Sequence, residues 1–212
     1  MADPVAEEKG PRWAREYLKI EGKADERGQF ERREALLAGL RGRVVEIGCG
    51  HGPNFSHYPT DVTEVVAVEP EPMLRAKALK AAESAPVPIT VVDAEAVALP
   101  GADGEYDAAV CALVLCSVPA QAGALAEIRR VLRPGGELRY YEHVVSARRL
   151  VAGLQRIADL GWSRVSGGCH MARDTEGAIE RAGFEIRSTD RFGFSPAPLM
   201  PTVSHVLGVA VR

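Results

Sequence analysis

A glycine-rich turn that follows a short apolar stretch holds the residues best suited to bind a ligand. Residues 44–47 are predicted to form a buried strand, and Gly48, Gly50 and Gly52 follow it at alternate positions. Glycine lacks the Cβ atom that would hold a ligand away from the backbone. Glu46, just before the turn, repels anions and attracts positive charge. The stretch therefore predicts a ligand that lies close to the backbone and carries a positive charge.

The spacing of these glycines argues against a dinucleotide. Dinucleotide-binding chains carry the pattern G-x-G-x-x-G, in which a helix N-terminus faces the pyrophosphate. Here Pro53 occupies the position of the third glycine in that pattern. S-adenosylmethionine contains no pyrophosphate, and its sulfonium and amino groups suit the acid at position 46. The turn thus favours S-adenosylmethionine, and a nicotinamide-dependent oxidoreductase is the alternative.

Acidic residues recur after the next two predicted strands. Glu69 ends the apolar run 65–69, where a carboxylate can accept hydrogen bonds from both ribose hydroxyls. Asp93 ends the run 89–93, where an acid can accept a hydrogen bond from the adenine amino group. Ligands of parallel sheets bind beyond the carboxyl ends of the strands. We therefore expect these turns to meet the strand end 111–113 at one crevice.

Strands and helices alternate along most of the chain. The patterns predict strands at 43–47, 65–69, 89–93, 107–113 and 137–142, helices at 72–84 and 119–132, and another helix that begins at Pro53. The tail adds helices at 146–162 and 175–182 and strands at 184–192 and 203–211. Near-continuous apolar strands separated by helices indicate a parallel sheet covered on both faces. Right-handed crossovers make this an α/β, Rossmann-like, doubly wound fold.

The first 40 residues have a helical pattern instead. An amphipathic helix is predicted from Pro11 and is interrupted at Gly22, and a second helix runs from about residue 25 to residue 40. These helices either cover one edge of the core or form a lid whose aromatic Tyr17 closes over the ligand. We describe residues 1–40 as an N-terminal helical cap or lid of the same domain.

The ordered motifs of the chain resemble those of class I S-adenosylmethionine-dependent methyltransferases. The matching stretches are 46–52 (EIGCGHG), Glu69, Asp93 and 132–136 (LRPGG). The resemblance extends from about residue 40 to the C-terminus and identifies residues 41–212 as the methyltransferase domain. It implies a seven-stranded sheet that ends in an antiparallel hairpin. It also implies S-adenosyl-L-methionine as the donor and S-adenosyl-L-homocysteine as the product.

By the same resemblance the glycine turn contacts the methionine part of the cofactor, Glu69 the ribose, and Asp93 with Ala94 the adenine. Most of the predicted cofactor residues follow the first four strands. The full set is Tyr17, Glu46, Gly48, Cys49, Gly50, Gly52, Asn54, Glu69, Pro70, Met73, Asp93, Ala94, Glu95, Cys111, Ala112 and Leu113.

A narrower resemblance concerns the acceptor. Residues 111–118, residues 142–144 and the turn at Cys169 that precedes Arg173 are similar to the methyltransferase-like branch that methylates small alkyl thiols. The resemblance implies methyl transfer to a small-molecule acceptor, with a thiol favoured. Amine, hydroxyl and quinone-carbon acceptors are the alternatives. A non-catalytic S-adenosylmethionine-binding regulator is the alternative of another class.

Methyl transfer from a sulfonium requires a protein base only where the nucleophile arrives protonated. A thiol has a reference pKa of about 8.5, so a modest change of environment yields the thiolate. His143 follows the fifth strand and is the candidate base, and its alternative role is that of a buried histidine bonded to the backbone. Cys116 is expected to line the pocket and His170 to orient the substrate. Cys169 and His170 have no second cysteine–histidine cluster at zinc-like spacing, so no metal site is predicted.

Composition and charge restrict the partners. The chain has 212 residues, of which 46% are hydrophobic, and a net charge of −3, so it exerts no long-range attraction on nucleic acid or anionic lipid. It shows no signal-peptide pattern and no apolar run long enough to span a membrane. Its four cysteines include no CxxC pair, which is typical of a reduced protein. We therefore expect a cytoplasmic protein with a small-molecule partner, no nucleic-acid partner and no membrane span.

Overall fold

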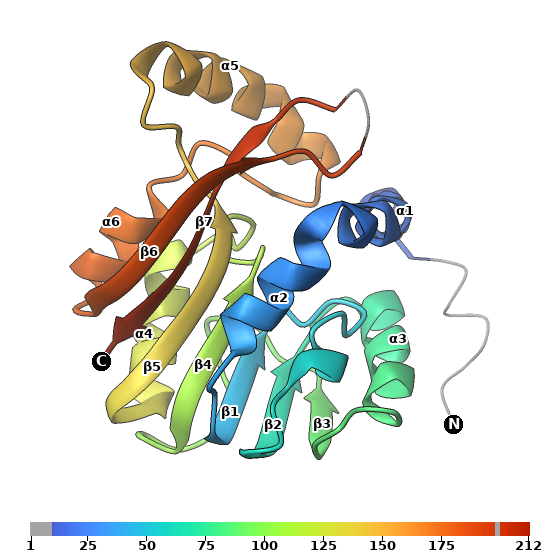
Figure 1. Cartoon of the computed structure of the whole chain (residues 1–212), viewed down its shortest axis with the longest axis vertical. Helices are drawn as coiled ribbons and strands as arrows, with labels where there is room; N and C mark the ends of the chain where they lie inside the picture. The colour runs from blue at the N-terminus through green and yellow to red at the C-terminus, as the bar shows by residue number, and fades with distance from the viewer. Residues whose placement is uncertain (1–9, 198–199) are drawn as a thin grey trace.

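A seven-stranded sheet forms the centre of the computed structural model, which describes residues 10–197 and 200–212 (Figure 1). The strands are β1 (Gly42–Ile47), β2 (Val62–Val68), β3 (Ile89–Val92), β4 (Tyr106–Ala112), β5 (Leu132–His143), β6 (Glu185–Phe194) and β7 (Val203–Val211). Their order across the sheet is β3-β2-β1-β4-β5-β7-β6. Strands β1 to β5 are parallel, and β7 runs antiparallel to both β5 and β6. The predicted Rossmann-like sheet with an antiparallel C-terminal hairpin is confirmed.

Helices cover both faces of this sheet and also lie beyond the carboxyl ends of its parallel strands. They are α1 (Arg12–Ala24), α2 (Phe30–Leu37), α3 (Pro72–Ala82), α4 (Gln121–Val131), α5 (Arg149–Val165) and α6 (Thr175–Arg181). Successive side chains of a strand point to opposite faces. Val45 joins a buried core with Leu125 of α4 and Ile179 of α6. Val44 points to the other face, where it joins a second core with Leu36 of α2.

The predicted helix at Pro53 is wrong. Residues 53–61 contain only one turn of 3-10 helix, Phe55–His57. Pro59 lacks the N–H group that a continuing helix needs, and the ring of Phe55 is buried in the core on the α2 side. The first crossover is therefore short, and α2 covers the face of the sheet that a crossover helix would otherwise occupy.

The break expected at Gly22 is also wrong. Helix α1 runs through Gly22, and the chain bends at Gly28 in the π-helical turn Asp25–Gln29. Gly28 has a φ of +103°, which glycine adopts without the steric cost of a side chain. The bend directs α2 onto the sheet and leaves α1 above the carboxyl ends of the strands (Figure 1).

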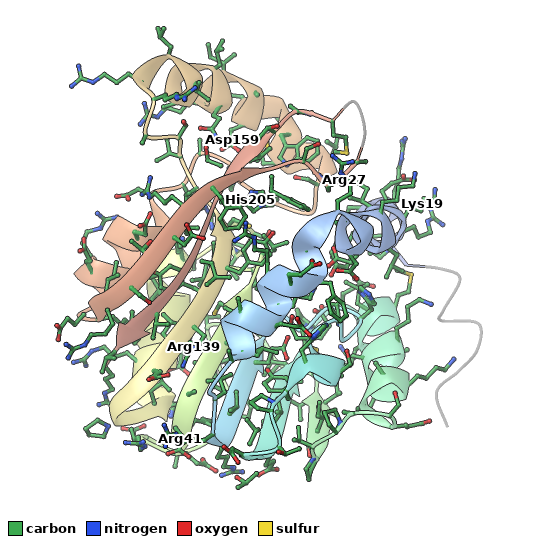
Figure 2. All side chains as sticks on the ribbon, viewed as in Figure 1. Lys19, Arg27, Arg41, Arg139, Asp159 and His205 are labelled. Atoms are coloured by element: carbon green, nitrogen blue, oxygen red, sulfur yellow. The ribbon has the colours of Figure 1, made fainter. Side chains whose placement is uncertain are left out.

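Helix α5 lies beyond the carboxyl ends of the strands rather than on a face of the sheet (Figure 1). Gln155 Oε1 accepts a hydrogen bond from Ser146 N at 2.7 Å. Asp159, labelled in Figure 2 on the side of α5 toward the rest of the molecule, accepts one from Met171 N at 2.7 Å. The large apolar residues that α5 exposes most are Leu150, Leu154, Ile157 and Leu160.

In the described part of the chain, no helix is both long and apolar enough to cross a membrane. The cytoplasmic location stays a prediction. The division into a cap, 1–40, and a methyltransferase domain, 41–212, also stays a prediction, and residues 1–9 of that cap lie outside the described residues.

Candidate cofactor and acceptor site

The glycine turn after β1 is shaped by positive backbone angles. Gly48 and Gly50 have φ values of +64° and +60°, a conformation that residues with side chains rarely adopt. A Cβ atom on Gly48 would lie 2.4 Å from Cγ2 of Val114, which belongs to the turn after β4. The turns after these two neighbouring strands therefore touch, and position 48 has no room for a side chain.

Glu69, directly after β2, holds the other side of the glycine turn. Its Oε2 accepts a hydrogen bond from Gly50 N at 2.8 Å, and its Oε1 accepts one from Glu71 N at 2.9 Å. Burial raises the pKa of this carboxyl. An ionised carboxylate offers about four lone pairs, so two remain for other donors. The backbone thus places Glu69 where it can accept from ribose hydroxyls.

Asp93, after β3, is joined to the same region by Arg75 of α3. Arg75 donates to Asp93 Oδ2 at 2.9 Å and to the carbonyl oxygens of Glu69 and Pro70 at 2.8 Å each. Asp93 and the nearby Glu95 are exposed, and Ala94 between them is half-buried. The strand ends predicted to bind ribose and adenine therefore lie side by side.

Tyr17 of α1 lies over the glycine turn. A Cβ atom on Gly50 would lie 3.1 Å from the Tyr17 hydroxyl, and the Tyr17 ring packs edge-on against His51 with 5.6 Å between the centroids. Burial raises the pKa of Tyr17 well above its ordinary value. Met73 of α3 is buried in one cluster with Ala14, and Tyr17 packs against that cluster. Helix α1 thus occupies the position of a lid over the turn.

His51 leaves a buried polar atom beside the turn. Its Nδ1 has no hydrogen-bond partner among residues 10–197 and 200–212. Burial lowers the pKa of His51 to about 4, so the ring is neutral at pH 7. A glycine cradle, a carboxylate with spare lone pairs and an unpaired imidazole nitrogen fit a ligand that carries hydroxyl and amino groups, as S-adenosylmethionine does.

Glu46 and Asn54 are buried and bonded within the protein, and their predicted contact with the cofactor stays a prediction. Glu46 Oε1 accepts from Asn54 Nδ2, and Glu46 Oε2 accepts from the Tyr58 hydroxyl, both at 2.8 Å. Asn54 Oδ1 accepts from Arg33 of α2 at 2.8 Å. Glu46 shares the strand face of Val44, so its side chain lies beneath α2 with these partners.

Burial also affects the charge of Glu46. Burial raises the pKa of Glu46 to about 7, although the hydrogen bonds from Tyr58 and Asn54 oppose the rise. The group is therefore not a permanent negative charge for a sulfonium. Because Arg33 also pairs with the buried Glu21 of α1, the chain of contacts connects the cap to the glycine turn.

Two predicted cofactor residues turn their side chains into the cores. Cys49 is buried in the α2-side core and Cys111 in the opposite one, and burial raises the pKa of both thiols well above the usual range. Only their backbone faces the site. Ala112 and Leu113 are partly exposed at the end of β4, and Leu113 has a φ of +58°, a strained value for this residue type.

The turn after β4 is held by Glu142, near the end of β5. Its carboxylate accepts hydrogen bonds from the backbone N–H groups of Val114, Leu115 and Cys116 at 3.0, 2.8 and 3.0 Å. Burial raises the pKa of Glu142, and these donors oppose the rise. Sequence reasoning missed this role of Glu142. The feature that could have revealed it is an acidic residue at the end of a strand, directly before His143.

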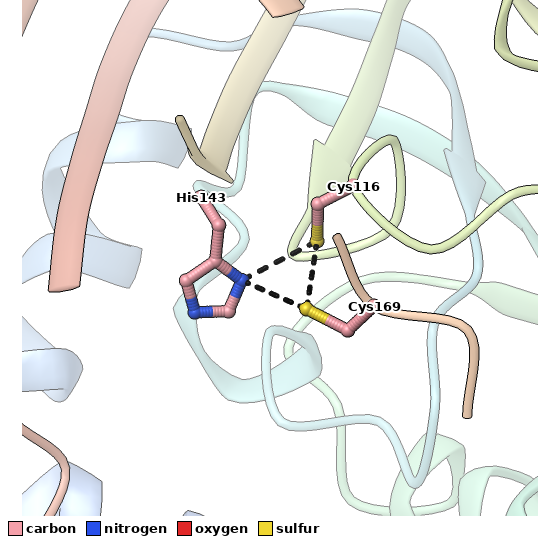
Figure 3. Close-up of side chains that lie close together, drawn as sticks. All are labelled: Cys116, His143 and Cys169. Atoms are coloured by element: carbon pink, nitrogen blue, oxygen red, sulfur yellow. Dashed lines mark hydrogen bonds between the residues drawn. The ribbon is translucent and has the colours of Figure 1, made fainter. Parts of the chain in front are cut away.

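His143 meets two cysteines from distant parts of the chain, as Figure 3 shows. Its Nδ1 lies 3.4 Å from Sγ of Cys116 and 3.4 Å from Sγ of Cys169, and the two sulfur atoms are 3.7 Å apart. Hydrogen bonds from Cys116 and His143 lower the pKa of Cys169 to about 4. Burial alone would lower the pKa of His143, but its contact with Cys169 outweighs burial and raises it. Cys169 is therefore a stronger acid than a free thiol, and His143 is a stronger base than burial alone would leave it.

His170 directs its ring to α5 rather than to this cluster. Its Nδ1 lies 2.9 Å from Asp159 Oδ2, and its backbone N–H donates to Cys116 O at 2.8 Å. Arg173 donates to two carbonyl oxygens of the turn after β4, at 2.7 Å each. His170 thus supports the cluster through its backbone, and its predicted contact with a substrate stays a prediction.

Aromatic rings of the C-terminal hairpin adjoin His143 on another side. The ring of His205 lies 4.5 Å from that of His143, and Phe192 stacks on His205 at 5.7 Å between centroids. Burial lowers the pKa of His205, labelled in Figure 2, to about 3, so this ring is neutral. Sequence reasoning missed this wall because the register of β6 and β7 brings Phe192 opposite His205.

The chain is similar to known methyltransferases. Residues 45–140 match a family model described as a methyltransferase domain. The chain is 36% identical over 188 residues to thiol S-methyltransferase TMT1B of Homo sapiens, and the match covers 83% of this chain and 74% of that protein. It is 37% identical over 209 residues to thiol S-methyltransferase TMT1B of Mus musculus, with 94% of this chain and 82% of that protein covered.

A solved structure of an S-adenosylmethionine-dependent methyltransferase from Thermotoga maritima has a TM-score of 0.72 to this chain at 21% identity. The match covers 95% of this chain and 97% of that one, and at this identity it concerns the fold alone. The glycine turn, the acids after β2 and β3 and the identity to the two relatives lead to the same family. The chain belongs to the class I S-adenosylmethionine-dependent methyltransferases, in the branch that contains the thiol S-methyltransferases, and S-adenosylmethionine is its methyl donor.

Proposed function

We propose that the protein transfers the methyl group of S-adenosylmethionine to the thiol of a small molecule. The observation that carries this proposal is the 36% identity, over 83% of the chain, to an enzyme named as a thiol S-methyltransferase. The end of β5 supports a sulfur acceptor, because His143 there already holds two cysteine sulfur atoms within 3.4 Å.

The donor and acceptor halves of the site are inferred to lie at adjacent strand ends. Strand β4 pairs with β1 on one side and with β5 on the other. We infer that the methionine part of the cofactor lies at Gly48 and Gly50, the ribose at Glu69 and the adenine near Asp93. The acceptor thiol then approaches from the side of His143.

In this arrangement the protein chiefly positions two reactants. The bound cofactor supplies an electrophilic methyl group on a sulfonium. The acceptor sulfur forms a bond to the methyl carbon while the bond from that carbon to the sulfonium sulfur breaks, which yields a thioether and S-adenosylhomocysteine. The thiol proton passes to His143, the proposed base, and from there to solvent. Contact with Cys169, which outweighs the opposing effect of burial, raises the pKa of His143 and so suits it to accept this proton.

The helical cap is proposed to act as a lid over both halves. A Cβ atom on Gly167 would lie 2.8 Å from the Trp13 ring, and Tyr17 lies over Gly50. Helix α1 therefore reaches from the glycine turn to the segment that carries Cys169. Such a cover excludes water from the reacting groups.

A panel of acceptors tests the proposed function. The protein is incubated with S-adenosylmethionine and, in separate reactions, a small alkyl thiol, a primary amine and a phenol, and mass spectrometry identifies the products. We expect a methyl thioether and an equal amount of S-adenosylhomocysteine from the thiol. Methylated amine or phenol without thioether would overturn the thiol acceptor. Cofactor binding by calorimetry with no methylated product would favour the non-catalytic regulator.

A further inference from the structure

Three soft ligand atoms converge from three separate parts of the chain. Sγ of Cys116 comes from the turn after β4, Nδ1 of His143 from the end of β5, and Sγ of Cys169 from the loop after α5. Figure 3 shows the three side chains directed toward one point. The proposed function uses His143 as the base and assigns neither cysteine a contact with the substrate.

The distances match those between the ligands of a tetrahedral zinc ion. Zinc lies about 2.3 Å from cysteine sulfur and about 2.0–2.1 Å from histidine nitrogen. Tetrahedral angles then place two sulfur ligands about 3.8 Å apart and a sulfur and a nitrogen about 3.6 Å apart. The observed separations are 3.7 Å between the sulfur atoms and 3.4 Å from each sulfur to Nδ1 of His143.

We propose that Cys116, His143 and Cys169 bind a thiophilic divalent cation, zinc foremost, and that its fourth coordination position receives the acceptor thiol. The second half of this proposal rests on the proposed function. Two cysteines and one histidine form a ligand set that occurs in catalytic zinc sites, where the fourth position stays open. Thiolate and imidazole ligands select zinc over magnesium or calcium, which prefer oxygen.

Charge favours an ion at this place. Two buried thiolates repel each other, whereas two thiolates and a neutral imidazole around a divalent cation carry no net charge. The carboxylate of Glu142 is not among the clustered ligand atoms and is bonded to the three N–H donors of the turn after β4. The ligand set is therefore made of sulfur and nitrogen.

The backbone holds the three ligands in place before any ion binds. Cys116 N donates to Glu142 at 3.0 Å, and Cys116 O accepts from His170 N at 2.8 Å. His143 is paired with His205 in the ladder between β5 and β7. Cys169 O accepts from the Ser166 hydroxyl at 3.4 Å. Such support around the ligands is a feature of metal sites.

The cation would generate the nucleophile. A coordinating thiol loses its proton, which passes to solvent, and binds as the thiolate. Its sulfur then takes the methyl group as the sulfonium carbon–sulfur bond breaks, and the neutral thioether leaves the cation. In this scheme His143 acts as a metal ligand, and the cation takes over the role of the base.

Metal binding can be measured without any methyl transfer. The protein is purified under reducing conditions, freed of metal with a chelator and titrated with Co²⁺, followed by competition with Zn²⁺. We expect one ion per chain, with the sulfur-to-cobalt charge-transfer band and the strong visible bands of a tetrahedral thiolate site. Cys169→Ser and His143→Gln should each weaken binding by at least about 100-fold. Cys111→Ala, which removes a buried cysteine outside the cluster, should retain the ion.

Two results would show that the cluster binds no metal ion. One is the absence of the tetrahedral cobalt spectrum in protein that still binds S-adenosylhomocysteine and is therefore folded. The other is a disulfide between Cys116 and Cys169 in protein kept reduced, detected by peptide mass. Equal cobalt binding by the wild type and by Cys169→Ser would also exclude this ligand set.

Binding of the acceptor thiol to the ion, the second half of the proposal, is measured separately. Addition of a small alkyl thiol to the cobalt-loaded protein should shift the spectrum, since the thiolate enters the fourth position. An unshifted spectrum, or thiol methylation at an unchanged rate after metal removal, would overturn this half. If the ion and the thiol bind but the complete acceptor panel yields no thioether, the proposed function fails and the metal site stands.

Discussion

Glu142 is the side chain on which the acceptor side depends most. Its buried carboxylate binds the N–H groups of three successive residues, the last of which is Cys116. The next residue along β5 is His143. A single carboxyl group therefore sets the distance between the ends of two strands, and the Cys116–His143 contact follows from it.

We expect Glu142→Gln to lower the free energy of unfolding by about 1.5–3 kcal/mol, because an amide has one acceptor oxygen and turns an NH₂ group toward backbone donors. Urea unfolding at neutral pH measures the loss. Glu137→Gln, in the middle of the same strand and paired with Arg139, is the matched control and should change stability by at most about 0.5 kcal/mol. Similar losses in both variants would contradict a special role for Glu142.

Glu46 makes the stability of the fold depend on pH. Burial raises its pKa from 4.5 to about 7, so the folded state binds the proton more tightly than the unfolded chain does. The contribution of Glu46 is complete below pH 4.5 and is lost as pH rises through 7. The difference between the pKa values in the unfolded and folded states corresponds to about 3 kcal/mol of stability.

Glu46→Gln should remove this dependence, because the amide does not titrate. Urea unfolding near pH 5 and near pH 8 gives the change in stability for each protein. Between these values the wild type should lose about 2.5 kcal/mol more than the variant does. If both proteins lose the same amount of stability, the Glu46 carboxyl is ionised over this whole pH range. The hydrogen bonds that it accepts would then outweigh the effect of burial on its pKa.

At the scale of elements, the cap is attached to the sheet at two places. Arg33 connects Glu21 of α1 with Asn54 beside the glycine turn, and Trp13 packs on Gly167. The first contact fixes the position of the cap relative to the donor half of the site, and the second fixes it relative to the acceptor half. Loss of the second should leave α1 able to swing away from the loop after α5.

We expect Trp13→Ala to raise the Kd for S-adenosylhomocysteine about 5-fold, equivalent to about 1 kcal/mol, because a looser lid retains the ligand less well. Calorimetry measures the Kd, and hydrogen exchange should show faster exchange in α1. Phe30→Ala, an exposed aromatic residue of α2 that packs on His57, serves as the control and should leave the Kd unchanged. An unchanged Kd for Trp13→Ala would exclude α1 as a lid.

The elements with strong apolar patterns were predictable, and their orientations were not. The ends of β1 and β2 follow from apolar runs that stop at Ile47 and Val68, so the positions of Gly48 and Glu69 were correct. The face that Glu46 uses depends on α2, which packs there from an earlier part of the chain. A pattern within the strand holds no information about that partner.

The cysteine–histidine cluster lay beyond sequence reasoning for a related reason. Cys116 and Cys169 lie 27 and 26 residues from His143, so no local spacing marks them as a set. They meet because β4 and β5 are neighbours in the sheet and the loop after α5 returns to the same edge. The prediction that no metal site exists was based on local spacing alone.

At the scale of the whole molecule, cofactor binding should stabilise the fold. The glycine turn contacts α1, the residue after β2 and the turn after β4. A ligand that binds in this turn therefore connects several elements. S-adenosylhomocysteine at 100 times its Kd should add about 2.7 kcal/mol to the free energy of unfolding. For a chain of this length the Tm should rise by about 2–4 °C per kcal/mol.

Differential scanning fluorimetry with S-adenosylhomocysteine and with NAD⁺ tests this expectation. The first ligand should raise the Tm and the second should not. Gly48→Ala should abolish the increase, since its Cβ atom would lie 2.4 Å from Val114 and displace the turn. A larger increase with NAD⁺ would contradict the assigned donor.

Helix α5 is attached to the rest of the chain mainly by the side chains of Gln155 and Asp159. Within residues 10–197 and 200–212, its side-chain hydrogen bonds do not reach the turns that are assigned to the cofactor. The exposed residues of α5 (Arg149–Val165) can therefore be substituted, or the whole helix replaced, without changing the residues that are assigned to the cofactor. A variant library confined to this one helix would therefore test whether acceptor preference depends on α5 while the donor site stays constant.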